Sequence, residues 1–253
     1  VEECIRVFRT AFPGGTVHAA PHNLGIALNF DRAERHFFET LNADLGFFFE
    51  DDMVLSPHYL TALEALSEFA LAEEQVGYVA AYGMHRASRE EQSRQRRRIV
   101  PMHHNWGFAL TRRQWRRQQA IVEGYLRLIQ DCEYSRRPHE AIRNYFSKLG
   151  VPANATSQDK AKDVACDVLG AARVMCFPVY GHYVGREGTH FTPKLYEQHG
   201  FGATVMFEEA PEGFDFPSSA ELSALVERSR RAKRDAAAAN KTTVMSVAAR
   251  PSP

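Results

Sequence analysis

The chain has 253 residues, of which 44% are hydrophobic, and its 31 Lys and Arg residues balance its 31 Asp and Glu residues. This length suffices for one domain with a sizeable core, and a formal net charge of zero gives no reason to expect binding to nucleic acid or to an anionic membrane. No apolar run reaches the roughly 20 residues that span a bilayer. The four cysteines lack C-x-x-C spacing, so we expect reduced thiols and no zinc site.

Helical and strand-like patterns alternate in the first third of the chain. The continuous apolar run at 45–49, Leu-Gly-Phe-Phe-Phe, is typical of a strand buried on both faces. Ser56 and Pro57 form a helix-start signal before a run with apolar residues at helical spacing. The expected order is helix 1–12, strand 16–20, helix 23–41, strand 45–49, helix 56–74 and strand 76–83. Because strands alternate with helices, we expect an α/β fold with a largely parallel sheet.

The rest of the chain continues this pattern and then changes in composition. A charged, loop-like insertion at 86–100 precedes a strand-like segment at 102–110 and a helix that begins at Thr111. Further helices are expected at 138–149 and 157–169, followed by a strand-like run at 172–185. We therefore divide the chain into a domain of residues 1–216 and a segment 217–253, a charged helix followed by a low-complexity tail. That tail is Ala-rich with little apolar surface to bury, so we expect it to be poorly ordered.

Three adjacent acids, Glu50, Asp51 and Asp52, follow the apolar run at 45–49. Ligands of open α/β sheets bind beyond the carboxyl ends of the strands, where this cluster is expected to lie. Adjacent carboxylates repel one another and lose hydration near a core, and their hard oxygens suit Mg²⁺ or Mn²⁺. The alternative is a solvated acidic turn before the helix that starts at Ser56.

The order of these segments resembles the GT-A nucleotide-sugar glycosyltransferases, specifically the N-acetylglucosaminyltransferase I family. In that family an E-D-D version of the DxD motif ends a core strand and precedes an apolar segment, and EDDMVLSPHYL at 50–60 is similar to it. NLGIALNF at 23–30, a Trp-Gly pair and GREGTH at 185–190 match in order and spacing. The resemblance covers roughly residues 16–205. It implies a Rossmann-like, mostly parallel central sheet flanked by helices, with the first strand of the family missing from this chain.

The resemblance also implies roles for the acids and an activity. Asp52 resembles the direct ligand of Mn²⁺ or Mg²⁺, and Glu50 and Asp51 resemble residues that contact the nucleotide. The implied activity is metal-dependent, inverting transfer of a sugar, with a UDP-sugar favoured as donor and a glycan or other hydroxyl compound as acceptor. The cytoplasm is favoured as compartment, and the Golgi lumen is the alternative if a membrane anchor precedes Val1.

Candidate contacts for the donor come from two further segments. Trp106 could offer a flat face to a sugar while Gly107 lets the backbone approach, although a Trp that fills the core is the alternative. Arg186 and Gly188 could approach a phosphate, and His190 could complete the metal shell. A plain turn explains the same glycines.

The candidate catalytic bases lie in the predicted helix at 157–169. Asp159, Asp163 and Asp167 follow one another at steps of four and so share one helix face. The family carries its base between the Trp-Gly and Gly-rich segments, which makes Asp159 the first candidate and Asp163 the second. The pair His139-Glu140 is a weaker candidate. A solvated acidic stripe is the alternative.

Two other functions remain open at this stage. A metal-dependent nucleotidyl or phosphoryl transferase uses the same carboxylates and Mg²⁺. A non-catalytic module that binds a nucleotide sugar or a glycan fits the missing first strand. Turnover of a nucleotide sugar distinguishes these alternatives.

Overall fold

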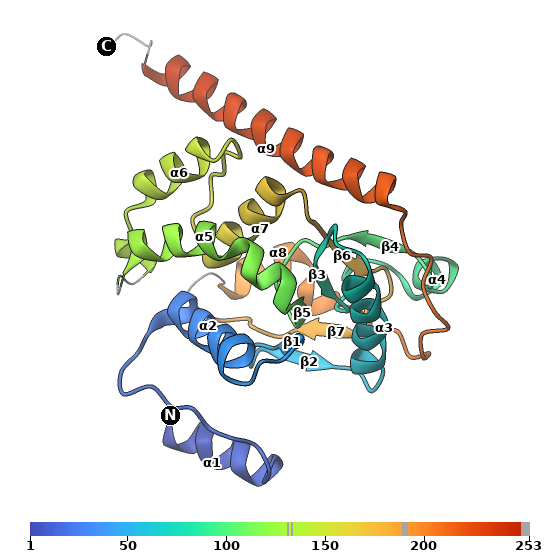
Figure 1. The fold of residues 1–253 in the computed structure, drawn as a ribbon. Coiled ribbons are helices and arrows are strands. Elements are labelled where there is room, and N and C mark those ends of the chain that lie inside the picture. Colours follow the sequence, from blue (N-terminus) through green and yellow to red (C-terminus); the bar gives the residue numbers. More distant parts are fainter. Residues whose placement is uncertain (131, 133, 189–191, 249–253) are drawn as a thin grey trace.

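The computed structural model describes residues 1–130, 132, 134–188 and 192–248. Its main sheet has five strands in the order β1-β5-β3-β6-β4, and two further strands, β2 and β7, form a small antiparallel ribbon (Figure 1). The strands are β1 (Leu45–Phe48), β2 (Met53–Leu55), β3 (Val76–Ala80), β4 (Ile99–Pro101), β5 (Phe108–Thr111), β6 (Ala172–Cys176) and β7 (Gly181–Tyr183).

The strand directions confirm an α/β fold but not a largely parallel sheet. β5 is antiparallel to both of its neighbours, β1 and β3, and β4 is antiparallel to β6. Among the described strands, only β3 and β6 form a parallel pair. The expectation of a largely parallel sheet is therefore wrong, because β5 enters from the carboxyl ends of β1 and β3 and is inserted between them. β1, β3 and β6 still run in one direction.

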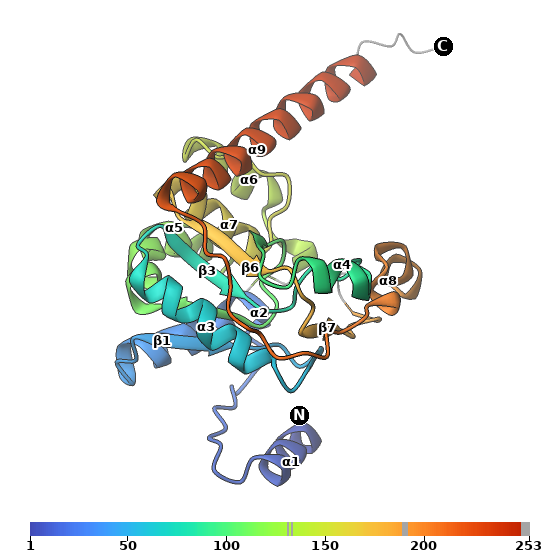
Figure 2. The same cartoon turned by 90° about the vertical axis from the view of Figure 1, so that its right-hand side faces the viewer.

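Helices surround this sheet, with α3 packed against β3 and β5, and α7 packed against β6 and α5 (Figures 1 and 2). The expected helices at 1–12, 56–74, 138–149 and 157–169 are confirmed. The α-helices are α1 (Glu2–Ala11), α2 (Gly25–Arg35), α3 (Tyr59–Ala72), α4 (Arg89–Arg94), α5 (Arg112–Ile129), α6 (His139–Lys148), α7 (Gln158–Leu169), α8 (Pro193–His199) and α9 (Ser219–Ala248). Shorter helical segments are η1 (His36–Thr40, a π-helix), η2 (Tyr134–Arg136) and η3 (Phe201–Ala203).

Three expected elements differ from the structure. Residues 16–20 form no strand, because no neighbouring strand pairs with them. The strand-like run at 172–185 splits between β6 and β7, which belong to different sheets. The loop-like insertion at 86–100 contains α4 and the edge strand β4.

The carboxy-terminal segment forms one long helix. α9 is a helix of 30 residues that crosses the body beside α7, and its second half extends beyond the body (Figures 1 and 2). Leu222 and Val226 from its first turns are buried in the main core. The division of the chain at 216/217 stays a prediction. None of the helices in the described part of the chain combines the length and the apolar composition needed to cross a bilayer.

The turn after β3 depends on a glycine. Gly83 has φ +74° and lies against the turn after β6, so a Cβ atom there would stand 2.1 Å from the carbonyl oxygen of Pro178. Gly170, the left-handed cap of α7, has φ +69° but no atom within 4 Å of the same position. The two glycines therefore share a backbone conformation and differ in the space around them.

We predict that Gly170→Ala lowers the free energy of unfolding by about 1 kcal/mol, the cost of a left-handed conformation for alanine. Gly83→Ala should cost about 1–3 kcal/mol more, because the added methyl group meets backbone that must move. Urea unfolding of both variants measures the difference. Equal losses would show that the close approach to Pro178 has no energetic consequence.

Candidate functional site

The acid cluster and the Trp-Gly pair meet at one edge of the main sheet. Phe48 at the end of β1 pairs with Phe108 at the start of β5, so the turn after β1 lies beside the segment before β5. Phe108 also pairs with Ala80 at the end of β3. The reversed direction of β5 thus brings residues 50–52 and 106–107 together at the carboxyl ends of β1 and β3.

Asp52 is held between the end of β1 and the ribbon strand β7. Its backbone oxygen accepts a hydrogen bond from Val184 N at 2.8 Å, and the Tyr183 hydroxyl donates to its carboxylate. A Cβ atom on Gly185 would lie 2.6 Å from Asp52 Oδ2, so a larger residue there would displace this carboxylate. Asp52 Oδ1 is buried and has no hydrogen-bond partner among the described residues. Such an orphaned oxygen is an available ligand position.

The electrostatics of the cluster favour a cation. Burial, together with the negative charges of Asp159, Asp52 and Asp51, raises the pKa of Glu50 from 4.5 to about 8. Burial and Asp51 also raise the pKa of Asp52. A bound cation would reverse both effects, because it stabilises the ionised carboxylates.

Asp159 reaches this cluster from the first turn of α7. The helix begins where the Ser157 side chain accepts a hydrogen bond from Lys160 N at 3.2 Å. Asp159 is half-buried, and its charge acts on Glu50 and on the buried hydroxyl of Tyr82. The first candidate base therefore lies within electrostatic reach of the acid turn, although the two segments are far apart in the sequence.

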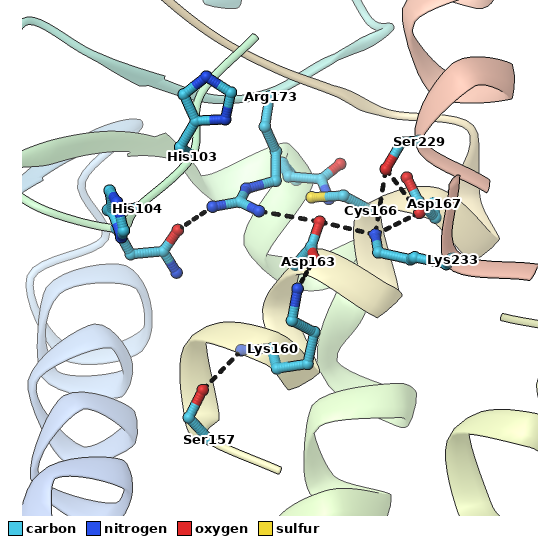
Figure 3. A network of polar contacts seen from close by, with 12 residues as sticks. His103, His104, Ser157, Lys160, Asp163, Cys166, Asp167, Arg173, Ser229 and Lys233 are labelled. Carbon is cyan, nitrogen blue, oxygen red and sulfur yellow. Dashed lines mark hydrogen bonds and ion pairs between the residues drawn. The ribbon is translucent and has the colours of Figure 1, made fainter. Parts of the chain in front are cut away.

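Asp163, the second candidate base, has a different environment. It is buried and forms ion pairs with Arg173 at 2.9 Å, Lys160 at 2.6 Å and Lys233 at 2.8 Å (Figure 3). Burial raises its pKa, but these three cations more than offset this, so the net shift of the pKa is downward. A carboxylate with a lowered pKa is a weaker base. Glu140, in the first turn of α6, is an exposed residue.

Trp106 and Gly107 are held by aromatic packing. The Trp106 indole stacks on His104 at 4.1 Å and on Tyr183 at 4.2 Å, both nearly parallel to it. The rings of His104 and Tyr183 are too close to the centre of the indole to share one face of it. One ring therefore covers each face of Trp106. Gly107 has φ +52°, and a Cβ atom there would lie 2.4 Å from the Tyr59 hydroxyl oxygen. In this arrangement Trp106 supports Tyr183 and offers no open face to a sugar.

The Gly-rich segment after β7 is only partly described. Arg186 is exposed and lies 3.7 Å from Glu197 of α8. Gly188 is exposed, with open space around its Cβ position. His190, the expected metal-shell residue, lies outside the described residues. The glycine that packs against the acid turn is Gly185.

The sequence pattern did not indicate four residues that lie near the site, namely Tyr183, Gly185, Lys162 and Glu34. Tyr183 and Gly185 lie at the end of the 172–185 run that splits between two sheets, so their position depends on that split. Lys162 forms a buried ion pair with Glu34 of α2, and its Nζ lies 4.8 Å from the ring centroid of Phe30. The sequence places Lys162 beside an acidic stripe, whereas its partner comes from a helix far earlier in the chain.

Mn²⁺ or Mg²⁺ fits the acid turn through few protein ligands. Among the described residues, no three His, Cys, Asp or Glu side chains are grouped so that they enclose a metal ion. Mg²⁺ commonly takes one or two carboxylates and completes its shell with waters and substrate phosphates. The unsatisfied Asp52 Oδ1 and the raised pKa of Glu50 suit such an open site.

The chain matches no protein-family model and no curated protein sequence. The functional interpretation therefore depends on the arrangement of the residues themselves.

The raised pKa of Glu50 predicts a pH-dependent effect on stability. Its pKa is about 8 in the folded protein and about 4.3 in an unfolded chain. The folded state therefore holds the extra proton between these values, and ionising Glu50 destabilises it as the pH rises. Glu50→Gln should raise the melting temperature at pH 8.5 and change it little at pH 4.5. A Glu50→Gln effect of equal size at both pH values would contradict this assignment.

Proposed function

We propose that the protein is a metal-dependent, inverting glycosyltransferase that moves a sugar from a nucleotide-sugar donor to a hydroxyl acceptor. One observation carries the proposal: Asp52 Oδ1 is buried without a hydrogen-bond partner among the described residues, at a turn held by the bond from Val184 N to the Asp52 backbone oxygen. Asp159 at the start of α7 lies within electrostatic reach of the same turn. A cation-binding turn beside a half-buried carboxylate provides the two functions that sugar transfer needs. One holds the leaving diphosphate and the other activates the acceptor.

The donor end of the site is the acid turn. Asp52 would hold Mn²⁺ or Mg²⁺ through its unsatisfied oxygen, while Tyr183 fixes the orientation of its carboxylate. The ion, when bound, neutralises the negative charge of the departing nucleoside diphosphate. Glu50 and Asp51 lie at the same turn, where they can contact the nucleotide. The resemblance to N-acetylglucosaminyltransferase I favours a UDP-sugar, as an analogy with that family.

The acceptor end of the site is Asp159. Its carboxylate accepts the proton of the acceptor hydroxyl while the hydroxyl oxygen forms a bond to the anomeric carbon of the sugar. The bond from that carbon to the diphosphate breaks, and its electron pair leaves with the nucleoside diphosphate. Attack from the side opposite the leaving group inverts the anomeric configuration, so no covalent sugar–protein intermediate is needed.

We predict that Asp52→Ala abolishes Mn²⁺-dependent binding of the donor and leaves the melting temperature near that of the parent. Removal of one acid from a like-charged cluster costs little stability. Tyr183→Phe should weaken metal-dependent binding by roughly 10–100-fold, as expected for an outer-shell partner. Asp44→Ala, an exposed acid before the same strand, is the matched control. Calorimetric titration of UDP-sugars with and without Mn²⁺ gives these affinities, and parental binding by Asp52→Ala would refute the metal site.

Asp159→Asn should lower kcat by about 10²–10⁴-fold, the usual contribution of a general base, while donor affinity stays unchanged. Asp163→Asn should mainly lower stability, because it removes a charge that three cations surround. Steady-state kinetics, followed through the release of nucleoside diphosphate, measures the turnover of both variants. Loss of turnover in Asp163→Asn with parental turnover in Asp159→Asn would assign the base to Asp163, one helical turn further along α7.

The same assays separate the alternative functions. Donor binding without any turnover in the parent would favour the binding module, and transfer of a phosphoryl or nucleotidyl group would favour the other enzyme class.

A further inference from the structure

The three acids of the α7 stripe have different partners. Asp159, Asp163 and Asp167 lie at steps of four on one helix face. Asp159 lies in the proposed site, whereas Asp163 and Asp167 are buried and contact cations from other elements (Figure 3). The ion pairs of Asp163 and Asp167 therefore hold this face of α7 toward β6 and α9.

Lys233 of α9 contacts both of these acids. Its Nζ donates to Asp163 Oδ1 at 2.8 Å, to Asp167 Oδ2, and to Ser229 Oγ of its own helix at 3.1 Å. Ser229 donates to Asp167 Oδ2 at 2.9 Å, and Arg230 donates to the backbone oxygen of Asp167 at 2.8 Å. Figure 3 shows Lys233 reaching from the side of α9 toward α7, between Asp163 and Asp167. This group of α9 side chains holds the second half of α7.

The two acids depend on Lys233 to different degrees. Asp163 also has Arg173 and Lys160 as partners. Within the described part of the chain, Lys233 is the only cationic side chain paired with the Asp167 carboxylate. The side chains of Asp167 and Lys233 are 4% and 12% exposed, so their attraction is little screened by solvent. Loss of the Lys233 charge would leave Asp167 buried without its cation, and hydration or protonation of that carboxylate would then weaken the attachment of α7 to α9.

This weakening would act on Asp159, because the residues of a helix are hydrogen-bonded to one another and open together. α7 is also held by the buried pair of Lys162 with Glu34 and by the pair of Asp163 with Arg173, so the loss of Lys233 loosens the helix on its α9 side. A displacement of about 1 Å at a reacting group can cost about 10²-fold in rate. We propose that α9 is a latch that holds α7 in its position, with Lys233 as a positioning residue for Asp159. The consequence for catalysis rests on the proposed function, whereas the effect on α7 does not.

The test compares Lys233→Met, Lys233→Arg and Arg231→Met in the full chain. Methionine keeps an apolar stem and removes the charge, and arginine restores the charge. Arg231 is the matched control, since it is 81% exposed on the same helix and pairs with Asp235 of α9. Lys233→Met should speed hydrogen exchange of the amides at 162–166, the first ones bonded within the helix, by about 10-fold or more, with α3 unchanged. It should also lower kcat by about 10-fold or more while the KM for the nucleotide sugar stays within about 2-fold. Lys233→Arg should recover most of both effects, and Arg231→Met should match the parent.

Each outcome decides a separate claim. Parental exchange at 162–166 in Lys233→Met overturns the latch. Faster exchange in α7 and α3 alike, with kcat and KM changing together, assigns Lys233 to overall stability and also overturns it. If the parent turns over no nucleotide sugar, the proposed function fails, and the exchange data still decide whether α9 sets α7.

Discussion

The partial burial of Glu50 within electrostatic reach of Asp51, Asp52 and Asp159 is the constraint on which the proposed site depends. Burial and the repulsion from these acids disfavour the ionised form of Glu50, so the folded protein keeps a proton on it up to a pH of about 8. Lys162 lowers the pKa of Glu50 somewhat, but its Nζ is paired with Glu34. A cation bound at this turn would take the place of that proton and stabilise the ionised carboxylate. The proposed donor site depends on this exchange of a proton for a cation.

The sheet topology determines which side chains share this charge. If β5 ran parallel to β1, residues 106–107 would lie at the opposite end of the sheet, away from the acid turn. Because β5 is antiparallel, Trp106 stands at the carboxyl ends of β1 and β3 and stacks on Tyr183. Tyr183 belongs to β7, which pairs with β2 directly after the acid turn. A covered Trp106 therefore still serves the site, since its stacking holds the tyrosine that orients Asp52.

Local patterns in the sequence predicted the helices and strands well but did not show which of them lie side by side. The acid turn after 45–49 and the helix that carries Asp159 were found, because an apolar strand and an amphipathic helix are visible in short windows. The strand directions were not found, since no local pattern says that β5 inserts between β1 and β3. The run 172–185 reads as one strand because its apolar residues are continuous, and only its pairing shows that it serves two sheets. For the same reason Tyr183 and Gly185 were missed.

The acid stripe of α7 shows why spacing alone does not assign function. Asp159, Asp163 and Asp167 are equivalent by spacing, and each could serve as a base or as a solvated charge. Their differences come from Arg173 on β6 and Lys233 on α9, which lie outside the helix. These cations lower the pKa of Asp163 despite its burial, so this acid is suited to holding the helix in place. Asp159, the same residue type, is instead within electrostatic reach of Glu50 at the carboxyl end of β1. One helix thus combines a structural half and a proposed catalytic half, and the partners contributed by tertiary structure separate the two.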